Sequence, residues 1–265
     1  MLKTPAALRE IAAKVSEGRR LSRAEGIQLY KSPDLLAIGQ MADLVRARKH
    51  GRRTYFILNR HINHTNVCVS RCKLCAFGRD ADSPGAYTMS LEQIEERAAR
   101  SAGQNIAEIH VVGGLNPDLK LDYYVEMMRR LRRTLPGVII QSLTAVEIDF
   151  LAREHGLTHR EVLAALQEAG LDSLPGGGAE VFSPRVREII CPEKVDGETW
   201  LAVHQAAHEL GIRTNATMLY GHVETIEERI DHLLRLRELQ DRTGGFLTII
   251  PLAFHPKNTD LEPLI

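Results

Sequence analysis

The sequence predicts an α/β fold, an open barrel of six parallel βα units that follows an N-terminal helical extension. From about residue 53 onwards, short β-rich runs alternate with longer amphipathic segments, which is the pattern of repeated βα units. The first 52 residues instead have apolar residues at helical spacing. A closed eight-stranded barrel needs about 250 residues of repeats. Because fewer than that follow the extension, a six-stranded open barrel is favoured.

The predicted elements follow in order along the chain. Asp34 begins an apolar-periodic helix that runs towards Gly51. Strands are expected at Thr54–Leu58, His61–Thr65, Ile106–Val112, Val138–Leu143, Leu171–Leu174, Arg213–Leu219 and Phe246–Leu252, the first of them outside the main series. Helices are expected at Ser90–Ala102, Leu121–Leu135, Val146–His155, Thr158–Ala169, Glu198–Leu210 and Thr225–Asp241. Residues 1–52 are therefore assigned to the extension and 53–265 to the barrel. No helix is expected after the last strand, which suggests a truncated C-terminus.

Composition narrows the class of protein. The 34 basic and 34 acidic residues give a formal net charge of zero, which argues against a dedicated binder of nucleic acid or of a membrane surface. No apolar run reaches the roughly 18 residues of a membrane span, and the N-terminus is typical of an amphipathic helix rather than a signal peptide. Three of the four cysteines fall within eight residues, which suggests a metal in a reducing compartment. The expected location is the cytoplasm.

Cys68, Cys72 and Cys75 form the pattern C-x3-C-x2-C directly after an early strand. A structural zinc site wants four protein ligands, whereas a four-iron cluster held by three thiolates keeps one iron free for a ligand. Spacing and ligand softness favour the cluster but leave zinc open, because His61, His64 or Cys191 could complete a zinc shell. Otherwise Cys191 is expected to be an ordinary buried thiol.

Polar residues and glycines recur where the predicted strands end. In parallel βα proteins the carboxyl ends of the strands carry the active site. The segments at these ends are Asn66–Phe77, Gly113–Gly114, Ser142–Glu147, Pro175–Glu180, Thr217–Glu224 and Pro251–His255. The sequence therefore predicts an active site at this end of the barrel.

The cysteine motif, the glycine pair after the next strand and the segment Thr217–Glu224 together resemble the radical S-adenosylmethionine superfamily. In that family the glycine pair belongs to a Gly-Gly-Glu-like segment that holds the methionine amino group, and a G-x-I-x-G-x-x-E segment binds adenine. Here Leu115 replaces the acid, and threonine replaces the first glycine of the second segment. The resemblance implies a [4Fe–4S] cluster on the three cysteines. It also implies S-adenosylmethionine contacts at Gly113, Gly114, Glu180, Thr217, Gly221 and Glu224.

Three acidic residues have a second interpretation. Glu180, Glu224 and Glu147 each lie where a carboxylate could simply favour a helix N-terminus through the helix dipole. For Glu147 that interpretation is preferred. Gly113 and Gly114 could likewise be no more than a turn. If they contact the cofactor instead, Gly114→Val is expected to weaken cofactor binding and to leave the cluster intact.

Longer stretches, 59–68, 170–180 and 214–222, resemble the aminofutalosine synthase family of the futalosine route to menaquinone. This resemblance implies a transferase that adds the 5′-deoxyadenosyl radical to 3-[(1-carboxyvinyl)oxy]benzoate, with loss of the carboxylate, to give 6-amino-6-deoxyfutalosine. It also implies a low-potential electron donor, ferredoxin or flavodoxin. The sibling dehypoxanthine futalosine cyclase shares residues 175–180 and stays an alternative, although 215–220 favours the synthase. The alternative of another class is a zinc-stabilised, non-catalytic binding scaffold.

The implied substrate carries two carboxylates, so its pocket should offer guanidinium or imidazole groups. Arg79, just past the cysteine motif, and His222 and His255, at strand ends, are the candidates for this catalytic role. Each could instead be an ordinary surface or core residue. Phe77 is expected to shield the cluster.

Overall fold

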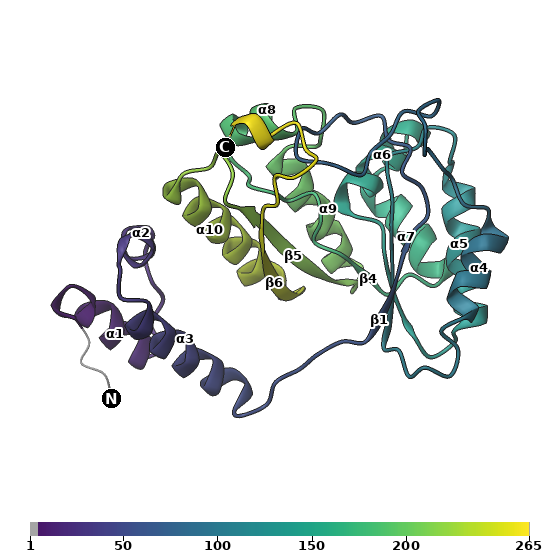
Figure 1. Cartoon of the computed structure of the whole chain (residues 1–265). Coiled ribbons are helices and arrows are strands. Elements are labelled where there is room, and N and C mark those ends of the chain that lie inside the picture. The colour runs from purple at the N-terminus through teal and green to yellow at the C-terminus, as the bar shows by residue number, and fades with distance from the viewer. Residues whose placement is uncertain (1–4, 265) are drawn as a thin grey trace.

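Six parallel strands, hydrogen-bonded in sequence order, form a half-barrel in the computed structural model, which describes residues 5–264 (Figure 1). The strands are β1 (Asn59–Asn63), β2 (Glu108–Val112), β3 (Ile139–Ser142), β4 (Ser173–Leu174), β5 (Arg213–Tyr220) and β6 (Phe246–Ala253). Every pair is parallel, so all six carboxyl ends lie at one edge. The predicted open (β/α)6 barrel is confirmed.

Helices cover the outer face of the sheet and follow the strands in alternation. They are α4 (Leu91–Ala99), α5 (Leu121–Thr134), α6 (Ala145–His155), α7 (His159–Ala169), α8 (Pro184–Ile190), α9 (Gly197–Glu209) and α10 (Ile226–Thr243). Capping boxes begin several of them, with Ser90, Thr144, Thr158 and Thr225 as N-caps, which satisfies backbone donors that a helix start leaves free. Helix starts were therefore readable from the sequence to within a residue or two.

The two faces of the sheet differ because side chains alternate along a strand. Ile62, Ile109 and Val111 are fully buried in the core that the strands form with the outer helices. Their neighbours His61 and His110 consequently lie on the opposite, inner face of the half-barrel. This alternation decides which side chains can reach a ligand inside the barrel.

The N-terminal helices form a small layer of their own. Here η1 (Ala6–Leu8), α1 (Arg9–Ser16), α2 (Arg23–Lys31) and α3 (Leu35–His50) surround a separate apolar cluster that includes Leu8, Ile11 and Val15. As predicted, Asp34 caps α3 by accepting the N–H of Ala37 at 2.9 Å. Helix α2 lies against α10 (Figure 1), and Arg23 pairs there with Asp231 at 2.7 Å.

Three expectations differ from the structure. Thr54–Leu58 is not a strand but an extended connection to β1, because no neighbouring strand supplies a ladder and β propensity alone does not form one. Its side chains stay in solvent, with Phe56 91% exposed. Helix α8 was not predicted, and its seven residues are too few for a clear period. A short 3-10 turn, η2 (Glu262–Leu264), follows β6.

Within residues 5–264, no helix combines the length and apolarity needed to span a membrane.

Candidate functional site

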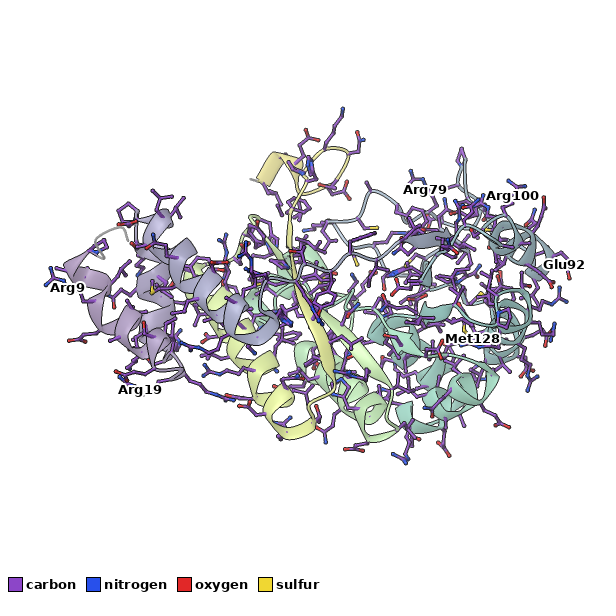
Figure 2. The ribbon with its side chains drawn as sticks, turned by 90° about the horizontal axis from the view of Figure 1, so that it is seen from below. Arg9, Arg19, Arg79, Glu92, Arg100 and Met128 are labelled. Carbon is purple, nitrogen blue, oxygen red and sulfur yellow. The ribbon has the colours of Figure 1, made fainter. Side chains whose placement is uncertain are left out.

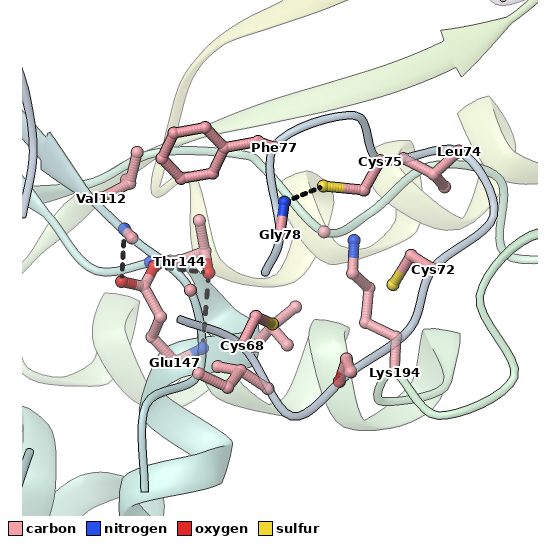
Figure 3. Close-up of a pocket in the computed structure, with 16 residues that line it drawn as sticks. Cys68, Cys72, Leu74, Cys75, Phe77, Gly78, Val112, Thr144, Glu147 and Lys194 are labelled. Carbon is pink, nitrogen blue, oxygen red and sulfur yellow. Dashed lines mark hydrogen bonds between the residues drawn. The ribbon is translucent and has the colours of Figure 1, made fainter. Parts of the chain in front are cut away.

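A pocket opens at the carboxyl ends of β1, β2 and β3 (Figure 3). It is lined by all three cysteines of the motif, by both glycines of the pair, and by residues from several distant segments. The lining residues are Cys68, Ser70, Cys72, Leu74, Cys75, Phe77, Gly78, Val112, Gly113, Gly114, Leu115, Thr144, Val146, Glu147, Gly178 and Lys194. The sequence prediction of a site at this end of the barrel therefore agrees with the position of the pocket.

Backbone hydrogen bonds fix the loop that carries the cysteines. The N–H of Cys68 donates to the carbonyl of Arg79 at 3.0 Å, and the N–H of Arg79 donates to Asn66 at 2.8 Å, so both ends of the loop are held together. Inside it, the N–H of Cys75 donates to the carbonyl of Cys72 at 3.0 Å. The N–H of Gly78 donates to the sulfur of Cys75 at 3.4 Å. The loop is thus pre-shaped to present three sulfurs to one pocket.

The donor set fits an iron–sulfur cluster better than a single ion. Three thiolates are soft ligands of the kind that iron–sulfur clusters use. Across residues 5–264, no three His, Cys, Asp or Glu side chains stand close enough together to hold one metal ion. A zinc ion would need its sulfurs about 2.3 Å from a common point. Cys191 is fully buried in an apolar cluster with Met218 and does not line the pocket, as expected for an ordinary buried thiol.

Lys194 supplies a positive charge to this pocket. Its ammonium lies 2.7 Å from Oε1 of Glu180, and both side chains are largely buried. Burial alone would lower the pKa of Lys194, but the carboxylate of Glu180 reverses this and raises it above its ordinary value. Burial also raises the pKa of Cys72 to about 12, with Lys194 opposing that shift. Iron would overcome this cost, because a thiol that coordinates a metal is deprotonated.

The glycine pair packs directly against the cysteine loop. The N–H of Gly114 donates to the carbonyl of Thr65 at 3.0 Å. A Cβ at position 114 would lie 2.8 Å from the Cβ of Cys68 and closer still to the carbonyl of Val67. A Cβ at Gly113 would meet the buried ring of His64. We therefore expect a side chain at position 114 to displace the loop, which argues against the expectation that Gly114→Val leaves the cluster intact.

Glu147 joins the third strand end to the second. Its carboxylate accepts the N–H of Thr144 at 2.7 Å, completing the capping box of α6, and it also accepts the N–H of Gly113 at 3.1 Å. Burial raises the pKa of Glu147 to about 7, although these hydrogen bonds oppose the shift. Glu147 therefore caps helix α6, as expected, and in addition holds the backbone of Gly113. Thr-x-x-Glu was visible in the sequence, whereas the contact with Gly113 depends on neighbouring strands.

The end of β5 forms a second group beside the pocket. Gly221 has a φ of +89°, a left-handed conformation that favours glycine. The carboxylate of Glu224 accepts the N–H of Gly221 at 2.6 Å and the guanidinium of Arg229 at 2.7 Å. Upstream, the hydroxyl of Thr217 donates to the carbonyl of Gly176 at 2.6 Å. None of these residues lines the cysteine pocket.

Glu180 connects that group to the pocket. Its carbonyl accepts the N–H of Leu219 at 3.0 Å, and its carboxylate holds Lys194, which lines the pocket. Its φ of +46° is unusual for a residue with a side chain, and such strain is common at functional sites. The cofactor residues expected from the sequence therefore lie along one continuous edge, with Lys194 as the member that sequence reasoning missed.

The three residues expected to bind substrate carboxylates lie outside the pocket. The guanidinium of Arg79 donates to the loop carbonyls of Ala76 at 3.0 Å and Gly78 at 2.8 Å, and Figure 2 shows it at the periphery. His222 has a fully enclosed side chain whose Nδ1 accepts the N–H of Val223 at 2.8 Å. His255 is exposed just after β6. Phe77 does line the pocket, beside the cysteines (Figure 3).

Comparison with known proteins agrees with this arrangement. A relative from Thermus thermophilus, an aminodeoxyfutalosine synthase, is 47% identical over 95% of this chain and 68% of its own length. Two relatives at 38% identity have other names. One is a 5-amino-6-(D-ribitylamino)uracil–L-tyrosine 4-hydroxyphenyl transferase from Methanopyrus kandleri, covering 95% of this chain and 67% of the relative. The other is a cyclic dehypoxanthine futalosine synthase from Streptomyces coelicolor, covering 96% and 65%. This chain thus spans about two thirds of the length of these relatives.

The comparison with solved structures finds the same fold. The crystal structure of methylornithine synthase superposes with a TM-score of 0.75 at 18% identity, covering 95% of this chain and 70% of the other. The model of the radical SAM superfamily matches residues 62–236, which include the cysteine loop, the glycine pair and the end of β5. Enzymes of this superfamily use a [4Fe–4S] cluster and S-adenosylmethionine, and the cysteine pocket offers the ligands that such a cluster needs. The chain belongs to the radical SAM superfamily.

Proposed function

We propose that this protein is an aminodeoxyfutalosine synthase. The observation that carries the proposal is the 47% identity to the Thermus thermophilus enzyme over 95% of this chain. The transferase relatives reach 42% identity and the cyclase relative 38%, so the synthase is the better supported activity. Bound together, the cluster and S-adenosylmethionine supply a 5′-deoxyadenosyl radical for addition to 3-[(1-carboxyvinyl)oxy]benzoate, which loses its carboxylate and yields 6-amino-6-deoxyfutalosine.

The residues that line the pocket suggest how it would hold the cofactors. Cys68, Cys72 and Cys75 would ligate the cluster. Gly113 and Gly114 let the backbone pack closely against His64 and the cysteine loop, where a Cβ would overlap their atoms. Both glycines line the pocket that the methionine would enter. These five positions would define where cluster and methionine meet.

Two buried ionisable side chains, the carboxyl group of Glu147 and the ammonium of Lys194, would orient the amino-acid end of S-adenosylmethionine. Glu147 lies beside Gly113. Its carboxyl group would take the role of the acidic residue that Leu115 replaces in this chain. Lys194, which lines the same pocket, would attract the methionine carboxylate, because a charge-assisted pair is strong in a site shielded from water. An acid and a base on one pocket match the zwitterion of an amino acid. Glu180, Thr217, Gly221 and Glu224 would then define the nucleoside side of the site.

Phe77 would limit water access to the reacting atoms. Its ring is 38% exposed and lies at the mouth of the pocket, packing edge-on to Tyr87 with ring centroids 6.4 Å apart. Excluding water protects reactive intermediates from side reactions. The protein's contribution would thus be position and shielding, while the cofactors supply the reactivity.

The electron donor would be a low-potential ferredoxin or flavodoxin. Cys75 is exposed at the surface of the loop, so a partner could approach the cluster from that side. Exposed thiolates of this kind persist in a reducing compartment, and the proposed location is therefore the cytoplasm. Replacing the chemical reductant dithionite in the assay by a reduced ferredoxin or flavodoxin system would test the donor. Turnover is expected with one of these proteins, and turnover with dithionite alone would contradict the proposed donor.

Anaerobic reconstitution followed by product analysis tests the activity. The reduced protein is incubated with S-adenosylmethionine and either 3-[(1-carboxyvinyl)oxy]benzoate or dehypoxanthine futalosine, and the products are identified by mass spectrometry. The proposal expects a nucleoside adduct from the first substrate. Free 5′-deoxyadenosine with consumption of the second substrate would instead identify the cyclase. A colourless protein with zinc and no iron would exclude both and support a binding scaffold.

A further inference from the structure

Two histidines stack on the inner face of the half-barrel, below the cysteine pocket. His61 on β1 and His110 on β2 are directly opposite in the strand register. Their ring centroids are 4.7 Å apart and their planes differ by 16°. Because Ile62, Ile109 and Val111 point into the buried core on the other face, both rings face the barrel interior. Ordinary core packing does not account for them, since His61 is exposed and the side chain of His110 is 20% exposed.

The stacked pair is close to the place where the cofactors would meet. Val112, two residues beyond His110 on the same face of β2, lines the cysteine pocket. Two residues along a strand correspond to about 7 Å. The two rings and the pocket therefore lie on the same face of the sheet, about 7 Å apart along β2.

We propose that His61 and His110 form the subsite that binds the aromatic carboxylate end of the substrate. The subsite presupposes the proposed function, because an aromatic dicarboxylate is the molecule that would need it. Imidazole suits both parts of such a group: its face packs against an aromatic ring, and its N–H groups donate to a carboxylate. Arg79 and His222 leave this role open, because each is engaged by its own loop: Arg79 donates to the carbonyls of Ala76 and Gly78, and His222 accepts the N–H of Val223.

Glu108 orients His110 within the pair. Its Oε1 lies 3.8 Å from Nδ1 of His110 and accepts the side-chain amide of Asn59 at 3.3 Å. Glu108 is 6% exposed, so its carboxylate faces its neighbours rather than solvent. His110 can then donate a ring N–H to the substrate carboxylate. His61 then serves as the flat wall beside it. Burial, and next the proximity of His110, lower the pKa of His61.

The alternative is a cross-strand pair that only stabilises the sheet. Cross-strand stacked pairs contribute modestly to the stability of a sheet, and a purely structural pair would tolerate any aromatic ring. His110→Phe separates the two roles, because it keeps an aromatic ring for stacking and removes both N–H groups. His61→Gln is a second variant at an exposed position, where substitutions usually change stability little.

Binding and turnover of 3-[(1-carboxyvinyl)oxy]benzoate are measured side by side on cluster-loaded protein. Calorimetry without S-adenosylmethionine gives the affinity for the substrate, and product analysis gives the adduct and free 5′-deoxyadenosine. His110→Phe is expected to weaken substrate binding about tenfold or more, the usual effect of losing a charge-assisted hydrogen bond, and to raise free 5′-deoxyadenosine per adduct. Iron content and thermal unfolding should match the wild type. His50→Phe, on α3 and away from the sheet, is the matched control and should bind normally.

The outcomes separate the subsite from the proposed function. If His110→Phe and His61→Gln both bind the substrate as tightly as the wild type does, and the wild type forms the adduct, the subsite proposal is wrong and the synthase proposal remains. Weakened binding in these variants without adduct formation by the wild type supports the subsite and removes the synthase proposal. Failure of the wild type to bind the compound removes both.

Discussion

The ammonium of Lys194 lies 2.7 Å from the carboxylate of Glu180, and the two side chains are only 16% and 11% exposed. The pair stands between the cysteine pocket, which Lys194 lines, and the end of β5, where the carbonyl of Glu180 accepts the N–H of Leu219. It thereby joins two segments that carry the expected cluster and nucleoside contacts.

Lys194→Met should destabilise the fold by about 3–5 kcal/mol, because it leaves the buried carboxylate of Glu180 without its partner. Denaturant unfolding measures this, with Arg100→Met as the control, since the exposed pair of Arg100 and Glu96 should contribute at most about 1 kcal/mol. Although burial opposes it, Lys194 lowers the pKa of Glu180. The stabilisation from Glu180 is therefore present above the unfolded pKa and is lost as the pH falls through the folded pKa. A variant as stable as the wild type at neutral pH would contradict this role.

Alanine at Cys68, Cys72 or Cys75 should abolish cluster loading and turnover, because the three sulfurs line one pocket. Iron and sulfide analysis after anaerobic reconstitution, together with the visible absorption spectrum, measures loading. Cys191→Ala is the control and should keep its iron, since this thiol is buried in an apolar cluster and does not line the pocket. Loss of iron from Cys191→Ala would disprove a three-cysteine ligand set.

Gly114→Ala should lower both iron content and thermal stability, because the new Cβ would overlap the carbonyl of Val67 and the Cβ of Cys68. Gly137→Ala is the matched control, since a Cβ there meets nothing within 4 Å. Reconstitution and thermal unfolding of both variants give the comparison. If Gly114→Ala loads a full cluster and only loses affinity for S-adenosylmethionine, the packing interpretation fails and the glycine serves the cofactor alone.

Glu147→Gln should flatten the pH dependence of stability between about pH 4.5 and 7. Burial raises the folded pKa of Glu147 from 4.5 to about 7, so the folded protein holds a proton in this range that the unfolded chain has released. The wild type consequently loses on the order of 3 kcal/mol of stability as pH rises through it. Denaturant unfolding at several pH values measures the slope.

Glu161 provides the control for that experiment. It completes the same Thr-x-x-Glu capping box at the start of α7, but it is exposed, and hydrogen bonds from Thr158 lower its pKa. Glu161→Gln should therefore leave the decrease of stability with rising pH unchanged. A Glu147→Gln protein with the same slope as the wild type would show that the carboxylate ionises normally.

Arg79→Lys should weaken retention of the cluster and leave substrate affinity unchanged. The guanidinium bridges the carbonyls of Ala76 and Gly78, and an ammonium cannot reproduce that planar fork. Iron loss during exposure to a chelator, measured beside substrate affinity, distinguishes the two roles. Normal iron retention with weakened substrate binding would instead support the role of Arg79 in substrate binding that the sequence predicts.

Much of the barrel could be predicted because its local signals agree with its global fold. Strand runs, capping boxes and glycine stops marked the core units from His61 onwards, and the helix starts at Thr144, Thr158 and Thr225 are set by residues three apart in sequence. The strand predicted at Thr54–Leu58 does not form, because there the local and global signals disagree. Its residues favour a strand, but a strand exists only where a neighbour pairs with it.

The sequence by itself determined the cysteine loop and its place after the first barrel strand, because ligand spacing and strand order are local properties of the chain. Only the tertiary structure decided the rest of the site. Glu147 reaches Gly113, Lys194 reaches Glu180, and His61 meets His110 because parallel strands and their loops bring together residues 14 to 49 positions apart. The same packing turned Arg79 towards its own loop, since a guanidinium close to free carbonyls binds them. Such contacts depend on the pairing of strands, which no single segment encodes.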